Sequence, residues 1–241
     1  MISRLHRLIA GATSVTGFTG AGISTECGVP DFRSPGSPWL ANKPIGFADF
    51  LRDPDLRAQG WRRKFAMDDL YAGAQPGRGH RALARLVASG KMPGIITQNI
   101  DGLHQASGIP PAKLAELHGN GSFAACLGCG MRHELKMLRA DFERHGHAPS
   151  CDCGGLVKSA TISFGQPMPA AAMRLAEALA RQCDLFLVIG SSLLVRPAAQ
   201  FPVLAKRRGA ILAIINNEPT PLDEIADLIV RGDIGTALDR L

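Results

Sequence analysis

Two close pairs of cysteines are the clearest candidates for chemistry in this sequence. Cys126 and Cys129 are separated by two residues, and after a spacer of 21 residues Cys151 and Cys153 are separated by one. Four thiolates at such spacing can hold a tetrahedral zinc ion, and in a chain of this size the pattern indicates metal rather than disulfides. Because four thiolates leave no open coordination position, we expect the zinc to be structural.

The second cysteine pair leaves the ligand set open. It is one residue shorter than the usual C-x-x-C, so its geometry must be tighter. His133, His145 and His147 lie close enough in sequence to compete as a ligand. Four cysteines remain the simpler set.

A glycine-rich turn is the second candidate. Glycines let backbone N–H groups approach a phosphate, and a helix N-terminus that follows them favours negative charge. A full G-x-G-x-x-G would need a third glycine where this chain has Thr25. A phosphate loop and an ordinary turn therefore remain equally good interpretations. The candidate phosphate-binding residues are Gly20, Ala21, Gly22, Ile23 and Ser24.

The residues that follow this turn could contact other parts of a dinucleotide. Asp31, Phe32 and Arg33 could reach a ribose, a nicotinamide ring and a pyrophosphate, respectively. The alternative is a turn with a buried phenylalanine. Further polar groups follow later apolar runs, and each could equally be a helix cap or a turn. The candidate residues in and beside these groups are Gln98, Asn99, Ile100 and Asp101, then Gly190, Ser191 and Ser192, and finally Asn216, Asn217 and Glu218.

One histidine has a setting suited to proton transfer. In Glu116-Leu117-His118-Gly119, the imidazole of His118 can take a proton near neutral pH, and the glycine leaves room for a substrate. Taken singly, a histidine before a glycine is more often structural than catalytic.

The elements that must position these groups alternate between strands and helices. This order predicts an α/β fold, a Rossmann-like, doubly wound parallel sheet covered on both faces. Ligands bind at the carboxyl ends of such strands, which is where the polar groups fall. The predicted strands are Ser14–Thr19, Gly94–Thr97, Leu185–Ile189, Ile211–Ile215 and Leu228–Val230, and the predicted helices include Arg81–Ser89, Ala170–Arg181 and Ala198–Arg208.

Two segments interrupt this alternation. One is rich in proline, glycine and charge, and the other contains the cysteine pairs. We expect residues 1–33, 76–118 and 161–241 to form the nucleotide-binding domain. Residues 34–75 and 119–160 would then form a smaller helical and zinc-binding domain.

The composition is that of an ordinary globular protein. The chain of 241 residues is 46% hydrophobic and 20% charged, with a net charge of +6. Its longest local excess of basic residues, Arg57 to Lys64, has no interleaved aromatic stacking pattern, so we expect no direct nucleic-acid partner. No apolar run approaches the roughly 18 residues of a membrane helix. We therefore expect a cytoplasmic protein with no membrane partner.

Taken in order, the motifs resemble those of the sirtuin (Sir2) family over nearly the whole chain. The series is GAGIS, GVPDFR, TQNIDGLH, LHG, the paired cysteines, FG, GSSL-x-V-x-PAA and INN. The resemblance is to the bacterial type, with Trp61-x-Arg-x-Phe more similar to class II members. It implies that NAD is a consumed co-substrate and that the zinc is structural. Acylated-lysine proteins or peptides would be the partners.

The family reaction assigns a role to each matched residue. The acyl oxygen of a modified lysine attacks the nicotinamide ribose and expels nicotinamide, and His118 then deprotonates the ribose. Lysine, nicotinamide and 2′-O-acyl-ADP-ribose are the products. The resemblance adds Asn99 and Asp101 to the catalytic residues and Ile234 to the candidate NAD-binding residues already named. It places a peptide strand against Ile162, Phe164, Gly165, Leu194 and Val195, with Trp61 as a further substrate residue.

Departures from the family pattern concern the substrate groove. Ser163 and Gln166 stand where a bulkier residue and a glutamate are usual, and Trp61 and Lys64 replace the Tyr and Arg of succinyl-preferring members. We therefore expect that short acidic acyl groups are not preferred. Three alternatives to deacylation are an NAD-dependent protein ADP-ribosyltransferase, a non-catalytic NAD or ADP-ribose sensor and, more weakly, a hydride-transferring dehydrogenase.

Overall fold

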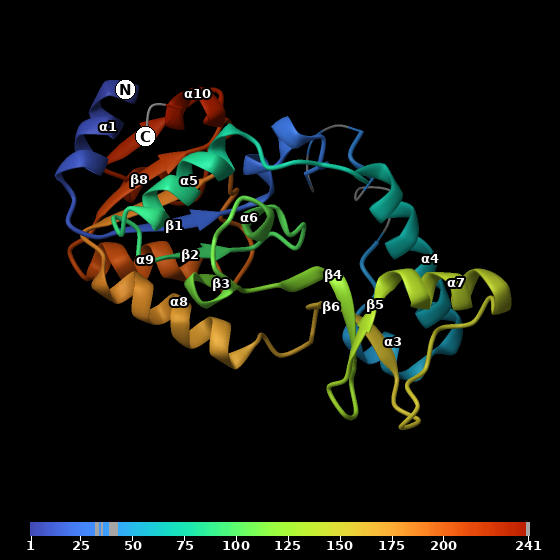
Figure 1. Cartoon of the computed structure of the whole chain (residues 1–241). Helices are drawn as coiled ribbons and strands as arrows, with labels where there is room; N and C mark the ends of the chain where they lie inside the picture. The colour runs from blue at the N-terminus through green and yellow to red at the C-terminus, as the bar shows by residue number, and fades with distance from the viewer. Residues whose placement is uncertain (32–33, 35, 39–42, 240–241) are drawn as a thin grey trace.

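The computed structural model describes residues 1–31, 34, 36–38 and 43–239. Its larger part is built on a six-stranded sheet in the order β3-β2-β1-β7-β8-β9, in which every neighbouring pair is parallel (Figure 1). The strands are β1 (Val15–Thr19), β2 (Gly94–Thr97), β3 (Leu114–Glu116), β7 (Leu185–Ile189), β8 (Ile211–Ile215) and β9 (Leu228–Val230).

Both faces of this sheet are covered by helices, which explains the continuous apolar runs of its strands. In β7, Leu185 and Leu187 face one core, while Phe186 and Val188 face the other. One face packs against α1 (Ile2–Gly11), α5 (Arg78–Ala88) and α10 (Ile234–Leu238), and the opposite face packs against α8 (Ala170–Gln182) and α9 (Gln200–Arg207) (Figure 1).

A second, smaller sheet lies to one side of the first (Figure 1). It is antiparallel, in the order β5-β4-β6. Its core joins Trp61 and Phe65 to Leu138, Phe142 and the buried cysteines. Its strands are β4 (Gly119–Cys126), β5 (Arg132–Glu134) and β6 (Val157–Thr161), and the helices beside it are α3 (Phe47–Arg52), α4 (Pro54–Leu70) and α7 (Leu135–His145).

The longest helix of the smaller part begins at a clear sequence signal. Pro54 occupies the first position of α4, and the carboxylate of Asp53 accepts hydrogen bonds from the backbone N–H groups of Asp55 at 2.9 Å and Leu56 at 3.1 Å. An aspartate cap followed by proline is a favoured helix start. Further along α4, the buried side chains of Trp61 and Phe65 stack with their ring centroids 5.4 Å apart.

The predicted fold class, a doubly wound parallel sheet with a smaller second domain, is confirmed. Four of the five predicted strands have the predicted bounds, and the first begins one residue later, at Val15. The strand β3 and the short helix α6 (Leu103–Ala106) were not predicted. The sequence of β3, Leu-Ala-Glu, has no β-branched or aromatic residue, unlike the equally short β9, and α6 is too short to show a helical periodicity. The exact division of the chain between the two domains stays a prediction. No helix of the described residues combines the length and apolarity needed to cross a membrane.

Candidate functional site

The order in which successive strands are added to the large sheet reverses at β1, so a topological switch point lies between β1 and β7. Strands β2 and β3 extend the sheet on one side of β1, and β7, β8 and β9 extend it on the other. Crevices at such switch points are the usual ligand sites of open α/β sheets. Most of the polar groups predicted from the sequence follow the carboxyl ends of these strands.

Backbone meets backbone at this switch point. The N–H of Gly22 donates to the carbonyl of Gly190 at 2.9 Å. A Cβ atom on Gly20 would lie 2.7 Å from the Gly190 oxygen, and one on Gly190 would lie 2.5 Å from the nitrogen of Ile23. Only glycine fits at these positions, and the turn Ala21–Ile23 therefore sits flush against the end of β7. This is the bare backbone surface that a phosphate-binding loop requires.

Ser24 joins two of the predicted catalytic residues. Its hydroxyl donates to Asp101 Oδ2 at 2.7 Å and accepts from Asn99 Nδ2 at 3.2 Å. The other oxygen of Asp101 accepts the N–H of Leu103 at 2.9 Å. Ser24 is fully buried. The carboxylate and the amide are therefore oriented before any ligand binds.

Gln98 ties the end of β2 to the end of β7. Its side-chain amide donates to Ser191 Oγ at 2.7 Å, and its backbone N–H donates to the Thr19 carbonyl at 3.0 Å. The carboxyl ends of β1, β2 and β7 thus meet at Gln98. The structure therefore brings together the predicted residues that follow these three strands.

The imidazole of His118 lies beside the same glutamine. Its Nδ1 is 3.0 Å from the carbonyl oxygen of Gln98. Because a carbonyl only accepts, Nδ1 carries the proton and Nε2 is left as the basic nitrogen. Within the described residues, Nε2 makes no hydrogen bond. Burial lowers the pKa of His118, and the Gln98 carbonyl opposes this only in part.

The backbone around His118 is equally constrained. The carbonyl of His118 accepts the N–H of Ile162 at 2.8 Å. Gly119 has φ of 72°, and a Cβ atom there would lie 2.0 Å from the carbonyl oxygen of Ala160. The backbone conformation and the packing therefore require a glycine directly after the histidine.

A small pocket opens beside these groups, and one of its residues was not predicted. Tyr71 reaches it from the end of α4, in the smaller part of the chain. Burial raises the pKa of its phenol, and the charges of Asp68 and Asp101 act in the same direction. No local motif marks this single tyrosine of the sequence. The pocket is lined by Ala21, Val29, Pro30, Tyr71, Gln98, Asn99, Ile100 and Asp101.

Other predicted nucleotide-binding residues lie at the ends of β8 and β9. Asn216 Nδ2 donates to the carbonyl of Glu218 at 2.7 Å, and Asn217 Oδ1 accepts the N–H of Gly232 at 2.9 Å. Ile234 begins α10 directly afterwards. Ser192 follows Ser191 in the turn after β7.

Four further predicted residues lie in the glycine loop or shortly after it. The side chain of Ile23 is 1% exposed and packs in the core, so only its backbone is available to a ligand. Asp31 accepts the N–H of Ser34 at 2.7 Å and its hydroxyl at 2.5 Å. Phe32 and Arg33 lie outside the described residues.

Two loops of the predicted substrate groove present apolar side chains to solvent. Phe164 is 67% exposed and Leu194 is 57% exposed. Gly165 adopts a left-handed conformation, with φ of 82°, and Val195 accepts the N–H of Ala199 at 3.0 Å. The structure does not bring Trp61 to this groove. Its side chain is 2% exposed because it fills the core of the smaller domain, so its prediction as a substrate residue is corrected.

The four cysteines form one cluster. Their sulfur atoms all lie within 4.8 Å of one another, with Cys126 to Cys153 at 3.5 Å and Cys129 to Cys151 at 3.8 Å. A tetrahedral zinc ion with Zn–S bonds of about 2.3 Å needs sulfur–sulfur edges of about 3.8 Å, so the set fits zinc. The N–H of Cys129, followed by that of Gly128, lowers the pKa of Cys126 to about 6, which favours its thiolate form.

The short spacing of the second pair is accommodated by a tight turn. The N–H of Cys151 donates to the Gly155 carbonyl at 2.9 Å, and the N–H of Gly154 donates to the Cys151 carbonyl at 2.8 Å. The competing histidines do not join the ligand cluster found among the described residues. His145 and His147 instead stack on each other at 5.8 Å.

Comparison with known proteins agrees with this geometry. The model of the Sir2 family matches residues 20–197. The NAD-dependent protein deacetylase of Rhodopseudomonas palustris is 58% identical over 98% of this chain and 94% of its own length. NAD-dependent protein deacetylase 1 of Bradyrhizobium diazoefficiens is 56% identical over 98% of this chain and 93% of its own.

Solved structures show the same similarity. A Sir2 protein with a peptide and NAD⁺ superposes with a TM-score of 0.87 at 33% identity, covering 100% of this chain and 96% of that one. A Sir2 protein with a deacetylated peptide and an acetyl ADP-ribose superposes with a TM-score of 0.90 at 32% identity, covering 99% and 96%.

Proposed function

This chain belongs to the Sir2 family, and from that membership and the geometry of its site we infer that it removes acyl groups from protein lysines in a reaction that consumes NAD. One water molecule is also consumed, and the products are the free lysine, nicotinamide and 2′-O-acyl-ADP-ribose. One observation carries the assignment. A histidine with one nitrogen fixed on the Gln98 carbonyl and the other free stands beside the Gln98–Asp101 wall of the pocket.

The residues present fit NAD. The glycine cradle at the switch point suits a pyrophosphate, and the fixed side chains of Gln98, Asn99 and Asp101 suit a ribose and a carboxamide. Asn216 and Asn217 would hold the adenosine end. When bound, NAD supplies an electrophilic ribose carbon with nicotinamide as its leaving group.

The chain's own part in the reaction is to orient and to accept a proton. Hydrogen bonding to Gln98 fixes the tautomer of His118, so Nε2 can take a proton from a ribose hydroxyl. Asn99 and Asp101 hold their positions through Ser24. An acylated peptide would add as a strand between the loops that carry Phe164 and Leu194, using main-chain hydrogen bonds.

The four-cysteine cluster would hold a structural zinc ion. A thiolate set of this kind is stable where disulfides do not form, which supports a cytoplasmic location. The zinc would fix the segment that carries α7 and β6, and β6 leads directly to Ile162 of the groove.

The proposal is tested with NAD and a panel of acyl-lysine peptides, following nicotinamide and peptide masses together. We expect acyl loss to match nicotinamide release one to one. Nicotinamide release without acyl loss, with ADP-ribose attached to protein, would instead establish ADP-ribosyl transfer. Binding of NAD with no turnover of any peptide would establish a sensor.

The acid limb of the rate profile is expected below pH 6.5, the ordinary pKa of histidine, because burial lowers the pKa of His118. Only the neutral imidazole can accept a proton. The rate should therefore be full above the lowered pKa and should fall as the pH drops through it. The measurement is kcat against pH with an acetylated peptide at saturating NAD. An acid limb above 6.5 would contradict the assignment of His118 as the base.

Charge around Lys64 predicts the acyl preference. Its ammonium forms an ion pair with Asp68 and is largely buried, and Asp68 also accepts from the pocket-lining Tyr71 at 3.4 Å. An acidic acyl group would have to share this cation with Asp68. We therefore expect acetyl-lysine to be processed faster than succinyl-lysine.

The variant Asp68→Asn tests this explanation. Removing the competing carboxylate should lower the acetyl-to-succinyl ratio of kcat/KM by about tenfold, which corresponds to about 1.4 kcal/mol. Asp69→Asn is the matched control, because Asp69 is exposed on the same helix and pairs with Arg139 at 2.6 Å. An unchanged ratio in Asp68→Asn would exclude this ion pair as the cause of the preference.

A further inference from the structure

The first turn of α5 touches both sides of the nucleotide site, and its cap comes from another part of the chain. The N-cap residue is Gly77, which has no side chain to accept a hydrogen bond. Instead, Glu26 Oε1 accepts the N–H of Gly79 at 3.2 Å. A Cβ atom on Gly77 would lie 2.2 Å from this oxygen, so the glycine leaves the space that the carboxylate occupies.

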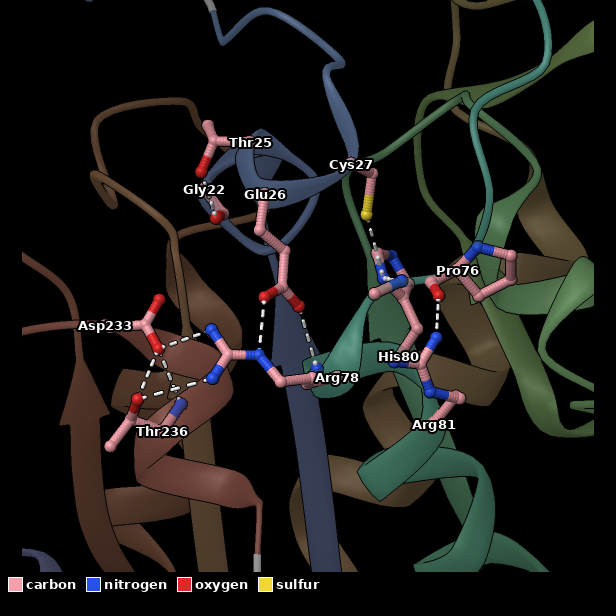
Figure 2. Close-up of polar contacts among 12 residues, drawn as sticks. Gly22, Thr25, Glu26, Cys27, Pro76, Arg78, His80, Arg81, Asp233 and Thr236 are labelled. Atoms are coloured by element: carbon pink, nitrogen blue, oxygen red, sulfur yellow. Dashed lines mark hydrogen bonds and ion pairs between the residues drawn. The ribbon is translucent and has the colours of Figure 1, made fainter.

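Arg78 links this carboxylate to the last helix. Its Nε donates to Glu26 Oε2 at 3.1 Å, and its Nη2 donates to Asp233 Oδ1 at 2.7 Å. Figure 2 shows the guanidinium between the two acidic side chains. A Cβ atom on Gly235 would lie 2.5 Å from this guanidinium, so the start of α10 lies directly against it. The guanidinium of Arg78 is thus held by packing against Gly235 as well as by its two ion pairs.

Both partners of Arg78 adjoin residues proposed to hold NAD. Glu26 is two residues beyond Ser24, which orients Asn99 and Asp101. Asp233 directly precedes Ile234 and follows Gly232, whose N–H donates to Asn217 at 2.9 Å.

The neighbouring Gly79 also lies close both to the loop after β1 and to the start of α10. A Cβ atom there would lie 3.0 Å from Ile23 and 3.2 Å from Ile234. These two residues belong to the glycine loop and to the adenosine end, respectively. The first turn of α5 therefore lies between the two segments that would flank the nucleotide.

We propose that Arg78 is a positioning residue that holds the loop after β1 against the start of α10 and thereby sets the affinity for the ADP-ribose part of NAD. It takes no part in the chemical step. The inference rests on the proposed use of NAD. It goes further by placing a determinant of affinity on a side chain that is not among the residues lining the pocket.

Arg78→Met tests the proposal because it keeps most of the side-chain length and removes the charge. We expect ADP-ribose, titrated calorimetrically, to bind about fivefold more weakly, as suits two partly exposed ion pairs. KM for NAD should rise equally, while kcat and the KM for peptide stay within about twofold. Arg78→Lys should recover part of the loss. The matched control is Arg181→Met, which removes a similarly exposed pair with Glu177 at 2.8 Å.

Salt dependence separates positioning from a general loss of structure. Added salt should weaken ADP-ribose binding more in the wild type than in Arg78→Met, because the two ion pairs are screened only where they exist. Unchanged ADP-ribose affinity in a folded Arg78→Met would overturn the inference. An equal fall in kcat, peptide affinity and thermal stability would overturn it as well. If no variant removed acyl groups, the proposed function would fail, whereas the ADP-ribose titration would still decide the role of Arg78.

Discussion

Replacement of His118 by alanine is expected to slow acyl-lysine removal by about 10²–10⁴-fold, the contribution typical of a positioned general base. The reason lies in the hydrogen bond from Nδ1 to the Gln98 carbonyl, which leaves Nε2 as the acceptor. Alanine removes that acceptor but leaves the Ser24, Asn99 and Asp101 network untouched. Affinity for ADP-ribose should therefore change by less than about twofold.

The control for this substitution is His145→Ala. His145 is an exposed histidine on α7, with Nε2 3.6 Å from Asp141, so its loss should leave the rate unchanged. Added imidazole should restore part of the rate of His118→Ala and none of any other variant, because it can replace only a missing base. A rate of His118→Ala within about tenfold of the wild type would remove His118 from the role of general base.

Removal of zinc is expected to unfold the smaller domain and leave the large sheet intact. Structural zinc contributes about 10–16 kcal/mol in isolated zinc-binding peptides at neutral pH. Here Cys126 and Cys151 belong to the same core as Trp61 and Phe65. Without the metal, four thiols would converge with no ion between them, and the core that they close would open.

Trp61 provides a direct readout of this event. The sequence has two tryptophans, so a Trp39→Phe background leaves Trp61 as the single reporter. Chelation, or Cys151→Ser, should shift its emission to the red and abolish peptide deacylation. ADP-ribose should still bind to the parallel sheet.

Cys183→Ala is the matched control, since Cys183 is buried in the large domain. The competing result is a metal-free protein that keeps the buried emission of Trp61 but has lost one chemical step. That outcome would make the metal catalytic.

The large sheet could be predicted because its signals are local. Leu185–Ile189 is buried throughout, Ile211–Ile215 is buried from its second residue onward, and both are continuous apolar runs. The polar groups that follow them meet at one edge because parallel strands end together. The close approach of Gly20 and Gly22 to Gly190 was not predicted, because it joins two segments that are far apart in the sequence.

The remainder of the site depends on contacts between distant segments. Tyr71 reaches the pocket from the other domain, and its sequence neighbours give no sign of it. Trp61 resembles a substrate residue by position in the family, yet it fills a core that only the folded small domain defines. Glu26 caps a helix that begins about fifty residues later, whereas capping signals are read from adjacent residues.

The central place of β1 in the sheet has a consequence for synthesis. β1 pairs with β7, and the two strands are joined by contacts that span 170 residues of sequence. Translation proceeds at about 5–20 residues per second. One edge of β1 therefore stays unpaired for about 10–30 s, until its second neighbour β7 has been synthesised. During that interval Val15–Thr19, which is buried throughout in the folded protein, is a strand with an unpaired edge. The nascent chain should therefore depend on a chaperone, and slowing translation between β2 and β7 should lower the yield of folded protein.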